Sequence, residues 1–219
     1  MIPKFRTAAI LVLLMTLPSC VPWTTRPIDA EKDSNAPSPA ASGPAAYVDA
    51  IWSTRLLPAV LRAAIDARIL LAALAASPED AMVRYGHREA NGPVYFVVKG
   101  DGVITDLDTR SRSGLALVDV APFDQRPDLS IQIGPVLRGN SLRDAAGVVR
   151  FTDFVNQLQF ADVGNELNDR VRKTVLAHLD LSTLKGRAVS FVGTLAAELD
   201  AEPPLREMVP VQLELKERR

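Results

Sequence analysis

The sequence predicts an α+β fold. N-terminal helices precede a small antiparallel β-barrel of about six strands, and a long helix is inserted before the last two strands. Three observations predict this order. Apolar residues recur at helical spacing over residues 47–70. Runs that alternate apolar and polar residues follow over 94–133 and again after 188. A second helical segment separates these two groups of strands.

The composition excludes several classes of protein. The chain has 219 residues, of which 47% are hydrophobic and 23% charged, so it is neither collagen-like nor wholly disordered. Its 25 Lys and Arg balance 26 Asp and Glu, and a nucleic-acid partner is therefore not expected. With two His and one Cys, the chain supplies neither a Cys/His zinc site nor an intramolecular disulfide, and we predict no metal and no cofactor.

The first twenty residues predict an exported chain. Lys4 and Arg6 precede an apolar run over 8–17, and Ser19 and Cys20 follow it. The run is too short to span a bilayer, so residues 1–19 are predicted to be a lipoprotein signal peptide. This arrangement resembles the lipobox of bacterial lipoproteins. The resemblance implies that Cys20 is acylated, becomes the first residue after cleavage and anchors the protein in the membrane.

Several acyl chains on one cysteine make a stable anchor, because each buried methylene contributes about 0.8 kcal/mol. Cleavage removes Lys4 and Arg6, and the acidic remainder gains nothing from anionic headgroups. Val21, unlike Asp, does not resemble an inner-membrane retention signal. We therefore expect the periplasmic side of a bacterial cell membrane, with the outer membrane favoured over the inner membrane. The alternative is an incidental cysteine in a cleaved signal.

Residues 20–45 are predicted to be a lipid-anchored flexible tether, because they are rich in proline and have few large apolar side chains. Residues 46–219 are long enough for a single periplasmic α+β domain with one core. Arg55, Arg62 and Asp66 interrupt the most apolar stretch, which excludes a transmembrane helix there.

The helical pattern over 47–70 is continuous apart from Pro58, which is expected to kink or restart the helix. Ser77 and Pro78 are typical of a helix start, and Gly86 is expected to end that short helix.

The strands are expected at 94–99, 103–108, 115–120, 129–133, 189–195 and 209–215. Gly100 and Gly102 predict a tight hairpin between the first two. The long helix is expected over 151–179, with a buried stripe formed by Phe151, Phe154, Val155, Leu158, Ala161 and Val163. This order of strands and helix is similar to an OB-fold, and closure would cover the strand edges.

Five blocks of the sequence carry a resemblance to a family. They are YVDAIWSTRLLP at 47–58, KGDGVITDLDTRSRSG at 99–114, GPVLRGNSLRDA at 134–145, FTDFVNQLQFADV at 151–163 and LKGRAVSFVGTL at 184–195. Together they resemble the bacterial predicted periplasmic lipoproteins classed as domain of unknown function 2291. The resemblance implies a periplasm-facing lipoprotein whose relatives are often encoded beside sugar-type ABC transporter genes. It brings no catalytic residues.

The strongest candidate binding residues lie in the loop before the long helix. Arg138 and Arg143, beside Asn140 and Asp144, can clamp a carboxylate, a phosphate or sugar hydroxyls. The alternative is that Arg143 and Asp144 tie this loop to the barrel.

Asn156 and Gln157 offer planar amides that suit sugar hydroxyls. The alternative for these two residues is hydrogen bonding to nearby backbone. His87 and His178 are expected to be structural.

No hydrolase elbow, P-loop or zincin motif occurs in the sequence. The strand region does contain Asp106, Asp108, Asp119 and Asp124, so a glycosidase with two correctly spaced carboxylates stays open.

The sequence thus predicts a non-enzymatic binding or accessory module associated with sugar transport, whose partner is the membrane together with a small ligand such as a sugar or an ABC-transport component. One alternative is a carbohydrate-acting hydrolase with two carboxylates about 5 to 9.5 Å apart. The other is a structural interaction lipoprotein, which an exposed apolar patch on the barrel or first helix would favour.

Overall fold

The computed structural model describes residues 39–89, 92–197 and 206–216, which belong to one unit of the chain. The predicted signal peptide and Cys20 lie outside the described residues, as does most of the predicted tether. Helix α1 (Pro39–Ile51) begins inside the range predicted as tether and is interrupted at Gly43, whose φ is 76°. The division into signal peptide, tether and domain stays a prediction.

The helical pattern over 47–70 forms several elements. After α1 come a π-helical turn (Trp52–Leu56) and α2 (Leu57–Ala63), with Pro58 in the first turn of α2, directly after the π-helical turn. The expected continuous helix is wrong beyond this point. Strand β1 (Ile65–Asp66) pairs in parallel with β3 (Val94–Asp108) before α3 (Ala67–Ala76) begins, and the Asp66 carboxylate accepts a hydrogen bond from the Arg68 backbone N–H.

Helix α4 (Pro78–Tyr85) is confirmed at both ends. The Ser77 hydroxyl accepts a hydrogen bond from the Asp80 N–H, Pro78 lies in the first turn, and Gly86 is the C-cap. Strand β2 (His87–Arg88) follows and pairs with β3.

The predicted hairpin at Gly100 and Gly102 is wrong, because both glycines lie inside one strand, β3 (Val94–Asp108). Neither has a positive φ. Their missing Cβ atoms allow close packing instead. A Cβ on Gly100 would lie 3.0 Å from the Phe191 ring, and one on Gly102 would lie 2.3 Å from a Val118 methyl group. The first half of β3 pairs with β6 and the second half with β4.

The remaining strands are β4 (Leu115–Val120), β5 (Leu129–Gln132), β6 (Ala188–Ala196) and β7 (Arg206–Leu215). Pairing runs from β3 through β4, β5, β7 and β6 and returns to β3. The expected antiparallel sheet is mixed, because β5 and β7 are parallel. A parallel pair needs a long crossover, and the segment that carries the helices after β5 supplies it.

The expected helix over 151–179 is shorter. A 3₁₀ turn (Phe151–Asp153) precedes α6 (Gln157–Val171), and a π-helical turn (Arg172–Leu176) follows it. Asn156 caps α6 by accepting from the Gln159 N–H at 2.9 Å. The predicted stripe is wrong at Phe151 and Val155, which precede the helix, and at Leu158 in its first turn; all three side chains are exposed. The buried face is formed by Val163, Gly164, Leu167 and Val171.

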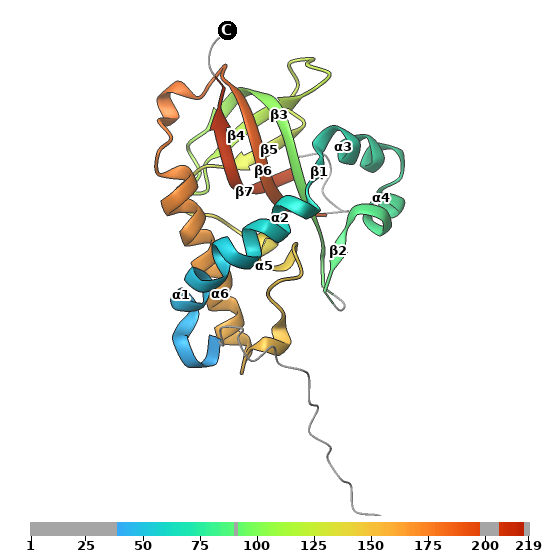
Figure 1. The fold of residues 1–219 in the computed structure, drawn as a ribbon. Coiled ribbons are helices and arrows are strands. Elements are labelled where there is room, and N and C mark those ends of the chain that lie inside the picture. The colour runs from blue at the N-terminus through green and yellow to red at the C-terminus, as the bar shows by residue number, and fades with distance from the viewer. Residues whose placement is uncertain (1–38, 90–91, 198–205, 217–219) are drawn as a thin grey trace, which may run out of the picture. The chain divides into compact units, whose positions relative to one another are not determined.

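One hydrophobic core joins the strands to the helices. Its largest side chains include Phe96, Ile104 and Phe191 from the strands, and Tyr47 and Leu167 from the helices. Figure 1 shows α1, α2, α5 (Ser141–Asp144) and α6 gathered at one end of the strands, whereas α3 and α4 lie at one side.

Candidate functional site

The structure divides the six predicted binding residues into three settings. Arg143 and Asp144 are buried in α5, Arg138 and Asn140 lie in the exposed loop before it, and Asn156 and Gln157 lie exposed at the start of α6.

Arg143 and Asp144 form a buried ion pair with both hydrogen bonds in place. Arg143 Nε donates to Asp144 Oδ1 at 2.6 Å and Nη2 donates to Oδ2 at 2.9 Å. Nη1 donates to the Phe160 carbonyl at 3.2 Å, and the guanidinium carbon lies 3.6 Å from the Phe160 ring centroid. Every guanidinium nitrogen therefore already has a partner within the domain.

Tyr95 of β3 completes this buried group. Burial, the charge of Asp144 and a hydrogen bond to that carboxylate together raise the pKa of the Tyr95 hydroxyl to about 12. The hydroxyl therefore stays protonated at neutral pH and is the donor toward Asp144. The group thus links β3, α5 and α6, and we call Tyr95, Arg143 and Asp144 the buried clamp.

Small side chains hold the loop before α5 against α6. A Cβ on Gly164 would lie 2.7 Å from Asn140 Oδ1, so α6 approaches the loop closely. Asn168 Nδ2 donates to the Gly139 carbonyl at 3.0 Å, and Gly139 has a φ of 86°. The position of Asn140 is therefore set by α6.

Arg138 belongs to a surface cluster. Its Nη2 donates to both carboxylate oxygens of Glu207, at 2.8 and 3.0 Å. The Arg138 backbone N–H donates to Gln132 Oε1 at 2.7 Å, and Gln132 Nε2 donates to Glu207 at 3.3 Å. The Arg138 side chain is 58% exposed and that of Glu207 34%. We call Gln132, Arg138 and Glu207 the surface cluster.

Glu207 is not among the binding residues predicted from the sequence. It lies on β7, 69 positions from Arg138, and the parallel pairing of β5 with β7 brings the two together. No local signal marks such a pair.

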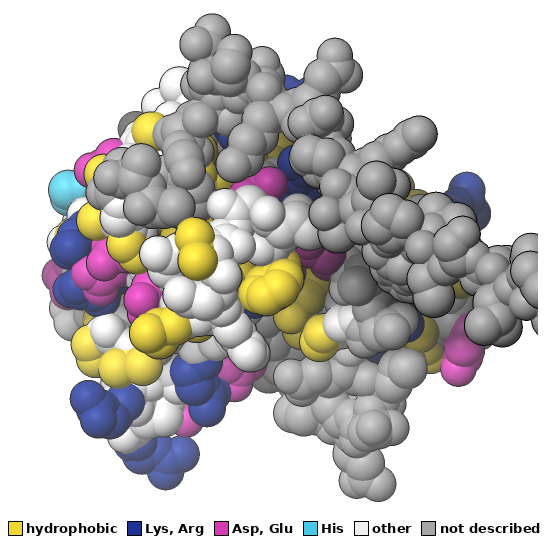
Figure 2. Space-filling view, turned by 90° about the horizontal axis from the view of Figure 1, so that it is seen from below, with side chains coloured by type: hydrophobic (Ala, Val, Ile, Leu, Met, Phe, Trp, Pro, Cys, Tyr) yellow, Lys and Arg dark blue, Asp and Glu magenta, His cyan; other side chains and the backbone are white. Residues whose placement is uncertain are grey.

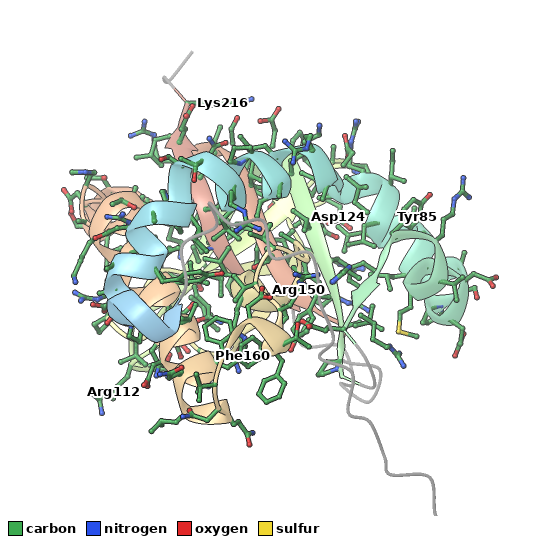
Figure 3. The ribbon with its side chains drawn as sticks, turned by 60° about the horizontal axis from the view of Figure 1, so that its bottom comes forward. Tyr85, Arg112, Asp124, Arg150, Phe160 and Lys216 are labelled. Atoms are coloured by element: carbon green, nitrogen blue, oxygen red, sulfur yellow. The ribbon has the colours of Figure 1, made fainter. Side chains whose placement is uncertain are left out.

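Four aromatic side chains, which were not predicted as site residues, pack against one another at the start of α6. The Phe160 ring meets Phe151 and Phe154 edge-on at centroid distances of 5.4 and 5.3 Å, and Phe154 meets Tyr47 of α1 at 5.6 Å. Figure 3 labels Phe160 at this end of the domain. The polar start of α6 at Asn156 and Gln157 thus lies beside aromatic side chains.

A shallow cleft of about 250 Å³ lies between α1 and α6. Its lining includes Asp49, Glu166, Arg170 and Lys173, and Asp49 pairs with Arg170. Because two acidic and two basic side chains line the cleft, their charges balance and favour neither anionic nor cationic ligands.

The four candidate catalytic carboxylates have structural partners. Asp106 contacts Lys185 Nζ at 2.7 Å, and this hydrogen bond holds the pKa of the Asp106 carboxyl below its usual range. Asp108 and Asp124 accept from backbone N–H groups two residues ahead, and buried Asp119 accepts from the Gln125 N–H. A glycosidase acid needs a raised pKa, whereas the pKa of Asp106 is lowered.

The described residues offer little for a bound metal. Within 39–89, 92–197 and 206–216, no group of three His, Cys, Asp or Glu side chains is placed to hold an ion. His87 lies on β2 and its ring faces Gly147, and His178 is exposed. In the same part of the chain, no helix has the length and apolar character needed to cross a bilayer.

The family profile described as predicted periplasmic lipoprotein (DUF2291) matches residues 10–214. The chain belongs to this family. The predicted resemblance is therefore confirmed. The matched span of this DUF2291 lipoprotein includes Cys20 and the three residues of the surface cluster. No curated protein matches the chain.

A solved structure supports the fold of this DUF2291 lipoprotein. The crystal structure of an OB-fold protein from Thermotoga maritima is similar to it, with a TM-score of 0.65 and 24% sequence identity. The match spans 79% of this chain and 98% of that chain. At this identity the likeness shows the fold and not the activity.

Proposed function

We propose that this DUF2291 lipoprotein is a non-enzymatic binding or accessory module, held on the periplasmic side of the outer membrane by acyl chains on Cys20. In this proposal residues 20–45 form the tether and residues 46–219 the single domain. The circuit of β3, β4, β5, β7 and β6 closes as an OB-like barrel, which gives the loop after β5 a rigid support.

The surface cluster is the observation that carries the binding role. Among the described residues, Arg138 is bonded through Nη2 alone on its side chain. Its Nε and Nη1 are therefore left to donate to the oxygen atoms of a ligand. The Gln132 side chain accepts a hydrogen bond from the Arg138 backbone N–H. This bond fixes the backbone that carries the guanidinium before a ligand binds.

The chemistry of this cluster selects oxygen-rich partners. Nε and Nη1 lie on different sides of the Arg138 guanidinium, so each can donate to a separate oxygen atom of a ligand, while Glu207 beside it can accept from hydroxyl groups. A sugar, a sugar acid or a sugar phosphate combines these features. An association with sugar transport rests on the family resemblance. The buried clamp, by contrast, holds the loop in place and takes no ligand in this proposal.

A thermal-shift screen of the full-length lipoprotein in detergent tests the proposal. The panel is monosaccharides, sugar acids, sugar phosphates and nucleosides. A ligand at a hundred times its Kd stabilises by about 2.7 kcal/mol, and Tm rises by about 2–4 °C per kcal/mol for a domain of this size. We expect Arg138→Ala to abolish the shift given by the ligand found.

Lys185→Ala is the matched control, because Lys185 and Asp106 form an ion pair of similar exposure elsewhere on the surface. The control should keep the full shift. A shift that survives in Arg138→Ala would contradict binding at the surface cluster. A panel that gives no shift would contradict a sugar-type ligand, and the accessory role would then be sought by crosslinking from residue 138 in native membranes.

A further inference from the structure

Apolar side chains stand exposed where α6 begins. Phe151 is 48% exposed, Val155 73% and Leu158 70%, and we call these three residues the α6 patch. Figure 2 views the domain from below and shows hydrophobic side chains lying between charged ones on the part of this face that is not grey. The α6 patch is therefore an apolar contact surface that charged side chains border.

The α6 patch is held open by the structure beneath it. The Phe151 ring rests edge-on against Phe160, and Phe160 is fixed by the cation–π contact with Arg143. Leu158 and Val155 flank Asn156, whose side chain is occupied in capping α6. Because these supports are rigid, the patch cannot fold back into the core to hide its apolar area.

The patch lies at the end of the domain where the predicted tether arrives. Helix α1, which begins at Pro39, packs on α6, and its Tyr47 ring contacts Phe154. Figure 1 shows the start of α1 and the start of α6 at the same lower end. The segment between Cys20 and Pro39 reaches at most about 65 Å when fully extended. An acylated Cys20 therefore keeps this end of the domain within that distance of the bilayer.

The charged groups next to the patch carry no net positive charge. Arg150 is paired with Asp153 at 3.3 Å, and Glu89 Oε1 accepts from the Phe151 backbone N–H at 3.3 Å. Asn156 and Gln157 are uncharged. Insertion of apolar side chains between headgroups, and not attraction to anionic lipid, is the interaction that this composition favours.

We propose that the α6 patch docks on the bilayer in which Cys20 is anchored, with Phe151, Val155 and Leu158 entering the boundary between headgroups and acyl chains. This inference rests on the proposed lipid anchor and adds a second contact to it. Docking turns the start of α6 toward the lipid and fixes the orientation of the domain on its membrane.

Site-specific fluorescence on the full lipoprotein tests the docking. The sole cysteine, Cys20, is consumed by acylation, so Leu158→Cys introduces the one free thiol for an NBD label. Val83→Cys is the matched control, since Val83 is an exposed apolar residue on α4, 86% exposed. Both proteins are reconstituted into vesicles of zwitterionic phosphatidylcholine that contain spin-labelled lipid.

We expect blue-shifted emission and strong quenching by the spin label at position 158, and neither at position 83. Phe151→Ser together with Val155→Ser in the Leu158→Cys protein should reverse both signals. Because all three side chains are exposed, these changes leave the core intact, and an unchanged Tm confirms it.

Flotation of the vesicles reports the anchor separately. A protein that floats while the probe at 158 stays in water would overturn the docking and leave the anchor standing. Failure to float would overturn the anchor and the docking with it. A probe at 158 that is shielded in native membranes but not on pure lipid would assign the α6 patch to a protein partner and overturn docking on lipid.

Discussion

The buried clamp and the surface cluster each contain an arginine paired with a carboxylate, and the two arginines, Arg138 and Arg143, lie in the same short stretch of the sequence. Arg143 and Asp144 have side chains 9% and 11% exposed, whereas Arg138 and Glu207 are 58% and 34% exposed. Removal of one partner of a buried ion pair strongly lowers stability, because the other charge then lies in the interior with neither its partner nor water around it. An exposed pair contributes little to stability and can exchange partners. The same residue types thus serve structure in one place and are available for binding in the other.

The largest effect is expected from breaking the buried clamp. Arg143→Ala should lower the free energy of unfolding by about 3–5 kcal/mol, because Asp144 is then buried without its main partner. Urea denaturation measures the loss. The double variant Arg143→Met with Asp144→Leu should recover most of it, since it leaves no unpaired charge. A loss below about 1 kcal/mol for Arg143→Ala would contradict the clamp.

Tyr95→Phe should have an intermediate effect of about 1–2 kcal/mol at neutral pH, because it removes one hydrogen bond to a charged group. Its pH dependence is more specific. The pKa of Tyr95 is about 12 in the folded protein against an ordinary value of 10, so the unfolded chain loses this proton first. The stability that depends on the protonated hydroxyl is complete below pH 10 and is lost as pH rises toward 12.

The measurement is the difference in unfolding free energy between wild type and Tyr95→Phe from pH 9 to pH 12. The difference should shrink over the interval from 10 to 12. Tyr85→Phe is the control for general alkaline effects. A difference that stays constant over this interval would show that Asp144 and burial do not hold the proton on Tyr95.

The smallest effect is expected at the surface cluster. Glu207→Gln should change stability by only about 0–1 kcal/mol, and added salt should shrink the change further. Thermal denaturation at low and high salt measures it. A loss of stability as large as that of Arg143→Ala would show that the exposed ion pair stabilises the fold as much as the buried pair does.

The sequence predicts those features whose cause is local. The cap at Ser77 and Pro78 depends on neighbouring residues alone, and α4 is found where it is expected. The alternation of apolar residues also places β4, β5, β6 and β7 within a few residues of their bounds. Such signals are complete within a few positions of the chain.

The features that were missed have distant causes. Gly100 and Gly102 resemble a turn, yet their role is to admit Phe191 and Val118 from other strands. The late start of α6 is an exception with a local cause, because the Asn156 side chain caps the helix by accepting from the Gln159 N–H, although the apolar spacing already resembles a helix face from Phe151 onward. Glu207 joins the candidate site only through the pairing of β5 with β7. Periodicity along the chain carries no information on any of these partners.

The parallel pairing of β5 with β7 also orders events in time. Ile131 pairs with Met208, so the circuit of strands cannot be completed until everything between them has left the export channel. In a chain that emerges amino end first, Cys20 is outside long before that moment. The cysteine of the proposed anchor is therefore available for acylation before the circuit of strands can close.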